Sequence, residues 1–245
     1  MENRITVAAC QLFDVQNDLE HSLSQISEYA TRAAAEGAAL LCFPESYLQG
    51  YILEESSARQ RAIDISSPTF AEILKRLERL QPTLLIGFIE KAGTRLFISA
   101  AVIRQGILLG CHRKTRLAEW ERLYEPGTET PIFEVTGLRF GVNICYELNF
   151  PECAAAIASQ QAQLMVCPCY NMLHPENAEL WKDRHNAIRA ERTRETGLWL
   201  LSADVTGRRD GQIAYGPTAL IDPDGTVVAQ VPLMEEGLLL REIQF

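Results

Sequence analysis

Short apolar runs alternate along the chain with longer segments in which apolar residues recur at helical spacing. Residues 5–12, ITVAACQL, form such a run and predict a strand. Residues 17–37 place an apolar residue every three or four positions and end at a glycine, which predicts an amphipathic helix. The next run, AALLCF at residues 38–43, is continuously apolar, as expected for a strand covered on both faces.

The same alternation continues toward the C-terminus. Helices are expected at residues 67–81, 151–161 and 176–196. Strands are expected at residues 83–90, 95–105, 107–112, 131–137, 138–145, 163–168 and 198–203. Residues 219–231 are typical of a hairpin that turns at Asp224 and Gly225. This order predicts an α/β fold, and we expect residues 1–245 to form a single domain.

Composition narrows the classes of function. The 245 residues are 47% hydrophobic, which is enough for one substantial core. The net charge of −9 and the lack of a basic cluster argue against a nucleic-acid partner, because phosphate backbones bind concentrated Lys and Arg. No run approaches about 18 apolar residues, and the N-terminus lacks the features of a signal peptide. We therefore expect a cytoplasmic protein with a small-molecule partner and no membrane contact.

The seven cysteines are expected to be reduced thiols. Their number is odd, and most of them lie in apolar runs where cysteine behaves as a small hydrophobic residue. Cys167 and Cys169 are close in sequence, but no second pair of Cys or His completes a four-ligand zinc site. We therefore expect no metal.

Polar residues at the ends of buried strands are the candidates for chemistry, because α/β proteins bind ligands beyond the carboxyl ends of their strands. Glu45 follows residues 38–43, Lys114 follows residues 107–112, and Cys145 ends residues 138–145. Each has an ordinary structural explanation when taken alone: a turn carboxylate, a solvated lysine and a buried thiol.

Local context is also compatible with chemistry at these positions, although the ordinary explanation is the better one for each residue taken alone. Alternation along residues 138–145 puts Cys145 on the less apolar face of its strand, and the helix expected from Pro151 favours a thiolate. Lys114 is one of only four lysines in a chain with 19 arginines, and a compact ammonium suits contact with a developing oxyanion. A partly desolvated Glu45 would have a raised pKa and could exchange protons near neutrality.

Three segments together resemble the signature motifs of the nitrilase superfamily, the carbon–nitrogen hydrolases, in its amidase-like branch. They are FPESYLQGY at 43–51, HRKTRL at 112–117 and GVNICYELNFPE at 141–152. The resemblance implies a four-layer αββα sandwich, a homodimer or higher homo-oligomer, and no cofactor. One departure is Glu147, where many amidase-like members carry aspartate.

The resemblance also implies roles for particular residues. It implies that Glu45 is the general base and acid, Lys114 the electrostatic stabiliser and Cys145 the nucleophile. It further implies a second glutamate, at Glu121 or, in the other register, Glu119. The remaining positions that it implies are Tyr146, whose backbone N–H would meet the oxyanion, and Tyr170, Asn171 and Met172, which would face the acyl pocket.

The implied reaction is hydrolysis of a small linear amide through a Cys thioester, with an ω-amide of a dicarboxylic acid or an N-carbamoyl compound as substrate. A nitrilase, acyl transfer to an amine, Cys–His chemistry and a metabolite-binding protein without turnover are the alternatives. Tyr146 favours amides, because a nitrilase-like pattern would place tryptophan beside the cysteine. A substrate carboxylate would require an arginine, and the sequence leaves Arg113, Arg116, Arg184, Arg189, Arg208 and Arg209 as candidates.

Overall fold

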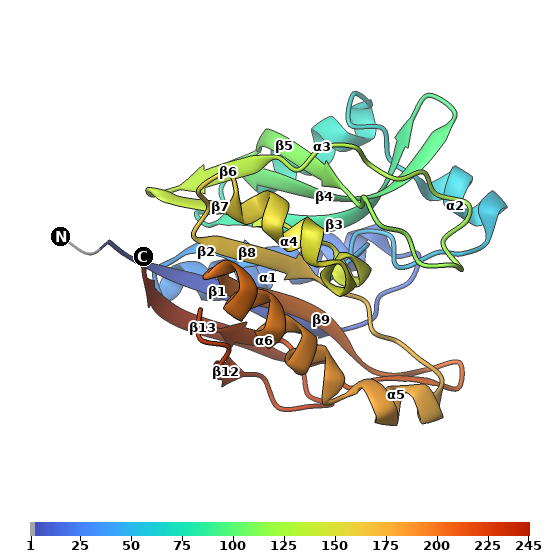
Figure 1. Cartoon of the computed structure of the whole chain (residues 1–245). Coiled ribbons are helices and arrows are strands. Elements are labelled where there is room, and N and C mark those ends of the chain that lie inside the picture. The colour runs from blue at the N-terminus through green and yellow to red at the C-terminus, as the bar shows by residue number, and fades with distance from the viewer. Residues whose placement is uncertain (1–2) are drawn as a thin grey trace.

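The computed structural model describes residues 3–245, in which two β-sheets pack face to face between layers of helices (Figure 1). The helices are α1 (Leu19–Ala35), α2 (Glu55–Arg61), α3 (Pro68–Leu77), α4 (Pro151–Ala158), α5 (Pro175–Trp181) and α6 (Arg184–Thr196), with the 3-10 helix η1 (Cys145–Asn149) before α4. Most of the helices agree with the predicted segments, as expected from their apolar spacing.

The strands divide between the two sheets. The first sheet contains β1 (Arg4–Phe13), β2 (Ala38–Cys42), β3 (Thr83–Ala92), β4 (Arg95–Arg104), β5 (Ile107–Arg113) and β13 (Gly237–Gln244). The second contains β6 (Ile132–Val135), β7 (Leu138–Val142), β8 (Leu164–Pro168), β9 (Trp199–Arg209), β10 (Gln212–Ala214), β11 (Ala219–Ile221) and β12 (Val227–Gln230). The sheets join where the last three residues of β1 pair with β9.

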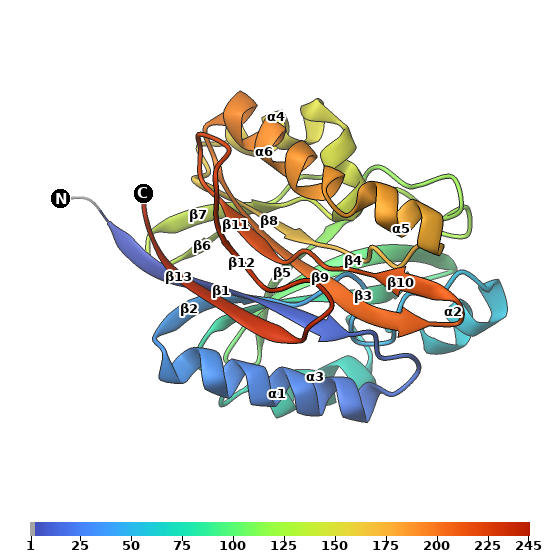
Figure 2. The same cartoon turned by 90° about the horizontal axis from the view of Figure 1, so that it is seen from below.

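Three apolar cores separate four layers. The central core lies between the sheets and includes Leu40 of β2 and Phe140 of β7. A second core packs α1 and α3 on the first sheet, and a third packs α4 and α6 on the second. Figure 2 shows α1 and α3 on one outer face and α4 and α6 on the other. The predicted αββα sandwich is therefore confirmed.

Parallel pairing aligns the carboxyl ends of the central strands. β1 pairs in parallel with β2 and β2 with β3, while β7, β8 and β9 are parallel to one another in the second sheet. The segments that follow β2, β7 and β8 therefore emerge at corresponding ends of the sheets. This edge carries the candidate chemistry.

Two predicted elements are wrong in detail. The single helix expected at residues 176–196 is two helices, α5 and α6, with a turn at Lys182 and Asp183. No glycine or proline marks this boundary, so the charged pattern could not reveal it. The strand expected at residues 138–145 ends at Val142, and Cys145 begins η1 instead.

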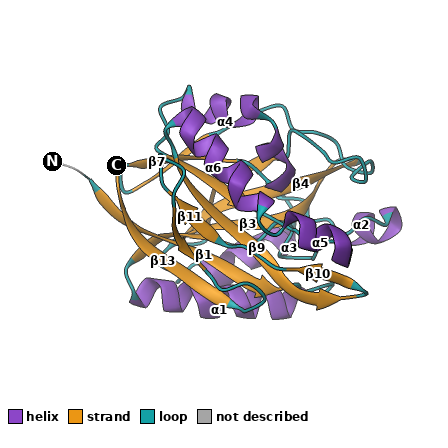
Figure 3. Cartoon of the chain, turned by 60° about the horizontal axis from the view of Figure 1, so that its bottom comes forward, coloured by secondary structure: helices purple, strands orange, loops and turns teal. Residues whose placement is uncertain are grey.

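Three elements were not predicted: α2, β10 and β13. The most extensive is β13, which pairs antiparallel with β1 over eight residues and lies beside it in Figure 3. Its alternation of buried and exposed positions is irregular, which explains why the sequence pattern missed it. Within residues 3–245, no helix combines the length and apolar character needed to cross a membrane.

Candidate active site

Glu45 follows β2 in a turn that the neighbouring strand holds in place. Its backbone N–H donates to the carbonyl oxygen of Cys169 at 3.1 Å, which links the ends of the two sheets. Gly87 of β3 lies against this turn, and a Cβ there would come within 2.4 Å of the Ser46 nitrogen and 2.8 Å of Glu45 Cα. Only glycine permits this approach without a shift of the backbone. The Glu45 side chain is consequently buried and fixed.

Lys114 follows β5 and forms the centre of a buried charged cluster. Its ammonium donates to Glu45 Oε1 at 2.8 Å and to Glu121 Oε1 at 2.6 Å. All three side chains are at most 2% exposed. The backbone N–H of Lys114 donates to Ile98 O on β4, so the sheet continues to hold the chain where the lysine emerges.

The structure distinguishes Glu121 from Glu119. Glu121 Oε2 accepts from the Ala118 N–H at 2.6 Å, and its Oε1 accepts from both Lys114 and the Tyr51 hydroxyl. Glu119 lies on the surface and pairs with Arg122. Of the two registers left open by the sequence, the one with Glu121 brings a carboxylate to the lysine.

Cys145 is the first residue of η1 and has a φ of +45°. This left-handed conformation is unfavourable for a residue with a Cβ and persists only where the surroundings impose it. Glu147 supplies part of that restraint, because its carboxylate accepts from the N–H groups of Ile144 and Thr115. His112 on β5 contacts the same carboxylate at 2.8 Å. Glu147 thus connects the Cys145 turn to the segment that carries Lys114.

Asn171 lies beside the Cys145 thiol on the second sheet. Its Oδ1 is 3.7 Å from Cys145 Sγ, and its Nδ2 donates to Asp204 Oδ2 at 2.5 Å. Asp204 is buried on β9 and also pairs with Arg189 at 3.3 Å. Because Asp204 accepts from the amide nitrogen, the amide oxygen of Asn171 faces Cys145.

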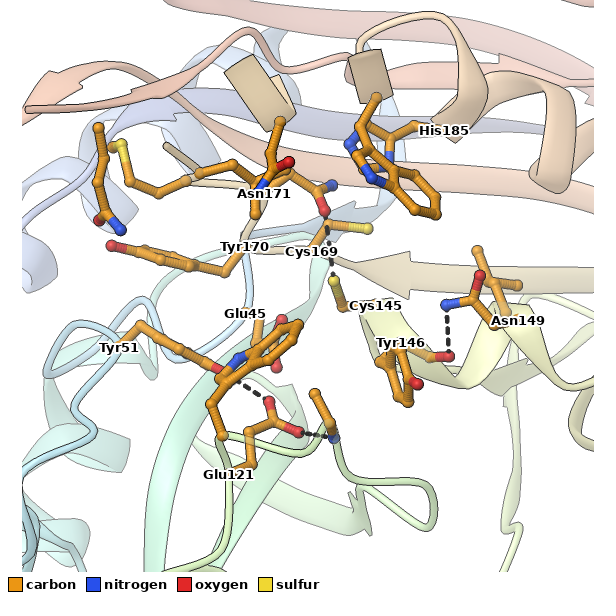
Figure 4. Close-up of a pocket in the computed structure, with 18 of the residues that line it drawn as sticks. Glu45, Tyr51, Glu121, Cys145, Tyr146, Asn149, Cys169, Tyr170, Asn171 and His185 are labelled. Carbon is orange, nitrogen blue, oxygen red and sulfur yellow. Dashed lines mark hydrogen bonds between the residues drawn. The ribbon is translucent and has the colours of Figure 1, made fainter. Parts of the chain in front are cut away.

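A cavity of about 780 Å³ opens over these groups. Its wall includes Glu45, Lys114, Glu121 and Cys145, together with the other predicted positions Tyr146, Tyr170, Asn171 and Met172. Figure 4 shows Tyr51 and Tyr170 on one side of Cys145, with Tyr146, Asn149 and His185 toward the other. The structure therefore brings every predicted site residue to one cavity.

Nearly the whole chain matches the model of one known protein family. The family model described as carbon–nitrogen hydrolase matches residues 6–245. The chain belongs to the carbon–nitrogen hydrolase family.

Individual relatives within the family carry different names. The chain is 29% identical to the chloroplastic omega-amidase of Arabidopsis thaliana, over 99% of this chain and 68% of that protein. It is 28% identical to the glutamine-dependent NAD(+) synthetase of Xanthomonas campestris, over 93% of this chain but only 42% of that protein. The crystal structure of an amidase from Nesterenkonia sp. superposes with a TM-score of 0.84 at 23% identity, covering 98% of this chain and 90% of that one.

The pKa values of Glu45, Lys114 and Cys145 are shifted for different reasons in this carbon–nitrogen hydrolase. Burial raises the pKa of Glu45 to about 7, against the opposing attraction of Lys114. Burial by itself would lower the pKa of Lys114, but Glu45 and Glu121 raise it well above its usual range. Lys114 therefore remains an ammonium near neutrality, where Glu45 exchanges its proton.

The thiol of Cys145 differs from the expectation. Its pKa is raised, first by a hydrogen bond with Cys169 and then by burial. The prediction that a helix N-terminus would favour the thiolate is therefore wrong. The six-residue separation between Cys145 and Pro151 is occupied by η1, so α4 does not begin at the nucleophile. The Cys145 side chain is therefore held as the thiol in the absence of a base.

The candidate arginines occupy different environments. Only Arg189 and Arg209 line the cavity. Arg113 instead pairs with buried Glu90, and Arg116 pairs with Glu152 at the surface. The sequence did not identify Tyr51, Trp181 or His185 as residues of the cavity. Tyr51 lies in the first motif but had no role assigned to it, and Trp181 and His185 lie in a strongly charged segment.

Cys167 and Cys169 lie close together in the described part of the chain. Their sulfurs are 3.4 Å apart and both residues are buried. Across residues 3–245, no group of three or more His, Cys, Asp or Glu side chains is arranged to hold a metal ion.

Proposed function

We propose that this carbon–nitrogen hydrolase cleaves the amide C–N bond of a small molecule through a thioester on Cys145. The observation that carries the proposal is the buried Glu45–Lys114 pair beside Cys145 in a substrate-sized cavity. A carboxylate, an ammonium and a thiol in one partly desolvated site supply a base, an oxyanion partner and a nucleophile.

The first half of the reaction forms the thioester. Cys145 Sγ attacks the amide carbon while the Glu45 carboxylate accepts the thiol proton. The oxyanion that develops is met by the Lys114 ammonium and by the backbone N–H of Tyr146. Glu45 then donates its proton to the nitrogen of the leaving amine, and the C–N bond breaks.

The second half releases the acid. Glu45, again a carboxylate, removes a proton from a water molecule that attacks the thioester carbon. Collapse of this intermediate expels Cys145 as the thiol and frees the carboxylic acid. In each half Glu45 accepts a proton and then returns it, to the leaving amine in the first half and to the Cys145 sulfur in the second, and a pKa of about 7 suits both transfers.

Glu121 has a supporting role in this scheme. It accepts from Lys114, as Glu45 does, and it is itself fixed by Tyr51 and by the Ala118 N–H. Glu121 remains next to the lysine while Glu45 carries the transferred proton, and its charge helps to keep the lysine an ammonium. Glu121 thereby orients the ammonium toward the oxyanion while Glu45 is free to move a proton.

Two named relatives support amide chemistry. The Arabidopsis protein is called an omega-amidase, and a Pseudomonas relative that is 28% identical is called an (R)-stereoselective amidase. A structure of the Nesterenkonia amidase shows covalent addition of the acetamide moiety of fluoroacetamide at its active-site cysteine. The homo-oligomer and the cytoplasmic location implied earlier stay predictions.

Ammonia release from a panel of amides, N-carbamoyl amino acids and nitriles tests the proposal. We expect release from at least one amide, and its loss in Cys145→Ala, because Cys145 is the proposed nucleophile. Cys111→Ala is the matched control, since Cys111 is the other partly exposed thiol and lies outside the cavity. Release that persists in Cys145→Ala would overturn the assignment of the nucleophile.

A further inference from the structure

The cavity offers much more apolar wall than a small amide needs. Its volume of about 780 Å³ lies within the range of pockets that enclose drug-sized ligands, roughly 300–1,000 Å³. Apart from the catalytic groups, the wall includes Tyr146, Leu148, Met172, Trp181 and Ile188. Burial of an apolar substituent against these side chains would stabilise the bound state.

Arg189, the first arginine in the wall, is fully engaged by the protein. It is 2% exposed and pairs with Asp204, whose side chain is completely buried. Its Nη1 also donates to the Pro217 carbonyl and to Asn186 Oδ1, and its Nη2 contacts Cys169 Sγ at 3.1 Å. A substrate carboxylate would have to take Arg189 from Asp204 and leave that aspartate buried without its partner, which is strongly unfavourable.

Arg209, the second arginine, is also paired. It forms an ion pair with Asp14, which is 4% exposed, and donates to the Tyr170 hydroxyl at 2.8 Å. Tyr170 donates in turn to Asp14, so the three side chains close a ring of contacts. Tyr170 also stacks on Tyr51, with ring centroids 4.6 Å apart, which restricts movement of this group.

The other ionisable groups in the wall do not favour an anion. Burial, followed by the charge of Arg189, lowers the pKa of His185 to about 3, so that its imidazole is neutral at pH 7. His174 is exposed to solvent, which screens its interactions. Lys114 is the remaining cation in the wall, and its ammonium is already paired with the carboxyl groups of Glu45 and Glu121.

We propose that this site selects uncharged amides bearing an apolar group about the size of a phenyl ring, and discriminates against amides bearing a carboxylate. This inference rests on the proposed amidase function, and it differs from the ω-amide of a dicarboxylic acid that the sequence suggested. Its basis is the pairing of both arginines in a cavity whose remaining wall is largely apolar.

A matched pair of substrates tests this selectivity. 3-Phenylpropanamide and succinamic acid share the unit CH₂CH₂C(O)NH₂ and differ in carrying a phenyl ring or a carboxylate. With the full chain at pH 7.5, we expect kcat/KM for ammonia release to be at least about tenfold higher for 3-phenylpropanamide, the lower end of what small changes in apolar contact produce. Equal or higher kcat/KM for succinamic acid would overturn the proposal and leave the amidase function standing.

An introduced cation provides the second test. Ile188→Arg places an arginine on α6, at a half-buried position of the cavity wall. Unlike Arg189 and Arg209, this arginine has no carboxylate partner in the described part of the protein. We expect the ratio of kcat/KM values to move about tenfold or more toward succinamic acid, since a buried hydrogen-bonded charge pair discriminates strongly. Ala187→Arg is the control on the same helix, because Ala187 is exposed and outside the wall. An unchanged ratio in a folded Ile188→Arg protein would contradict the proposal.

If neither amide is hydrolysed, the proposed class of substrate, an uncharged amide with an apolar group, is wrong. The amidase function is then judged separately, by mass spectrometry of the chain after addition of p-nitrophenyl acetate. An acetyl group that appears on Cys145 and is lost with time would retain the hydrolase. No acetylation of Cys145 would overturn both proposals together.

Discussion

At the scale of single residues, Glu45 is subject to two opposing effects. Burial disfavours its carboxylate, whereas the Lys114 ammonium at 2.8 Å favours it. The result is a pKa of about 7, so protonated and ionised forms coexist near neutrality. A more exposed glutamate would be ionised throughout this range and would be a poorer proton donor to a leaving amine.

The pKa of Glu45 predicts the pH dependence of the reaction. In the proposed mechanism the free enzyme must hold Glu45 as a carboxylate to accept the thiol proton, so kcat/KM should rise about tenfold per pH unit below about 7 and level off above it. Lys114 does not change the pH profile of kcat/KM near neutrality, because its pKa is raised above the usual range. Initial rates between pH 5.5 and 9 measure this profile. A flat profile would show that Glu45 is not the base, and Glu45→Gln should remove turnover while the protein stays folded.

The same group makes a predictable contribution to stability. Its folded-state pKa of about 7 exceeds the ordinary value of 4.5, so the unfolded state releases the proton first. The contribution of Glu45 is therefore most favourable below about pH 4.5 and declines by about 3 kcal/mol as the pH rises through 7. Urea unfolding of the wild type and Glu45→Gln at pH 5 and pH 8 isolates this change. We expect the variant to gain stability relative to the wild type at pH 8, and no relative gain would contradict the raised pKa.

At the scale of secondary-structure elements, turns rather than strands determine the geometry of the site. Glu45, Lys114 and Cys145 all lie just beyond strands, and each turn is fixed by a contact from a different element. β3 supports Glu45 through Gly87, and Glu147 connects the turns of Cys145 and Lys114.

Gly87 is expected to be essential for the position of Glu45. In Gly87→Ala the new methyl group would meet the backbone of Pro44, Glu45 and Ser46, and the turn would have to move. We expect kcat/KM to fall by at least about tenfold and the free energy of unfolding to fall by about 1–3 kcal/mol. Gly93→Ala, in the turn between β3 and β4, is the control: its φ of +63° costs stability, but nothing lies within 4 Å and activity should persist. Equal activity in the two variants would exclude this role.

Glu147 makes a different prediction, because it touches no substrate. Glu147→Gln loses the charge that accepts from two backbone N–H groups and from Thr115 Oγ1. We expect slower alkylation of Cys145 by iodoacetamide and a kcat reduced by about 10²-fold, as the nucleophile turn loses its restraint. The matched control is Glu152→Gln, a surface position on α4 paired with Arg116. If Cys145 in Glu147→Gln is alkylated at the wild-type rate, Glu147 does not restrain the Cys145 turn.

The central groups of the site could be predicted from sequence, whereas the substrate wall could not. Glu45 and Lys114 follow apolar strands with clear patterns, and strand order brings their ends together. Trp181 and His185 belong to a charged segment whose pattern indicated only one long helix, whereas the structure has a break at residues 182–183, without glycine or proline, and both side chains line the cavity. The pairing of Arg189 with Asp204 joins α6 to β9 and depends on packing alone.

At the scale of the whole molecule, the site lies on the boundary between two halves of the chain. Glu45, Lys114 and Glu121 belong to the first half, and Cys145 and Asn171 to the second. The Glu45 N–H to Cys169 O hydrogen bond and the short β1–β9 pairing join the halves at this edge. The central core between the sheets therefore sets the distance from base to nucleophile.

Because the site residues are divided between the two halves of the chain, we expect that this protein can be cut between them and reassembled. A cut after Thr128, in an exposed loop without regular structure, gives one fragment with the base and lysine and another with the thiol. Each fragment alone should be inactive, and co-expression of both should restore ammonia release through complementation, because the large apolar faces of the two sheets must cover each other. Activity in the fragment 129–245 alone would show that the first half is dispensable. Complementation without any attached partner would show that the contact between the two halves is sufficient to assemble the site.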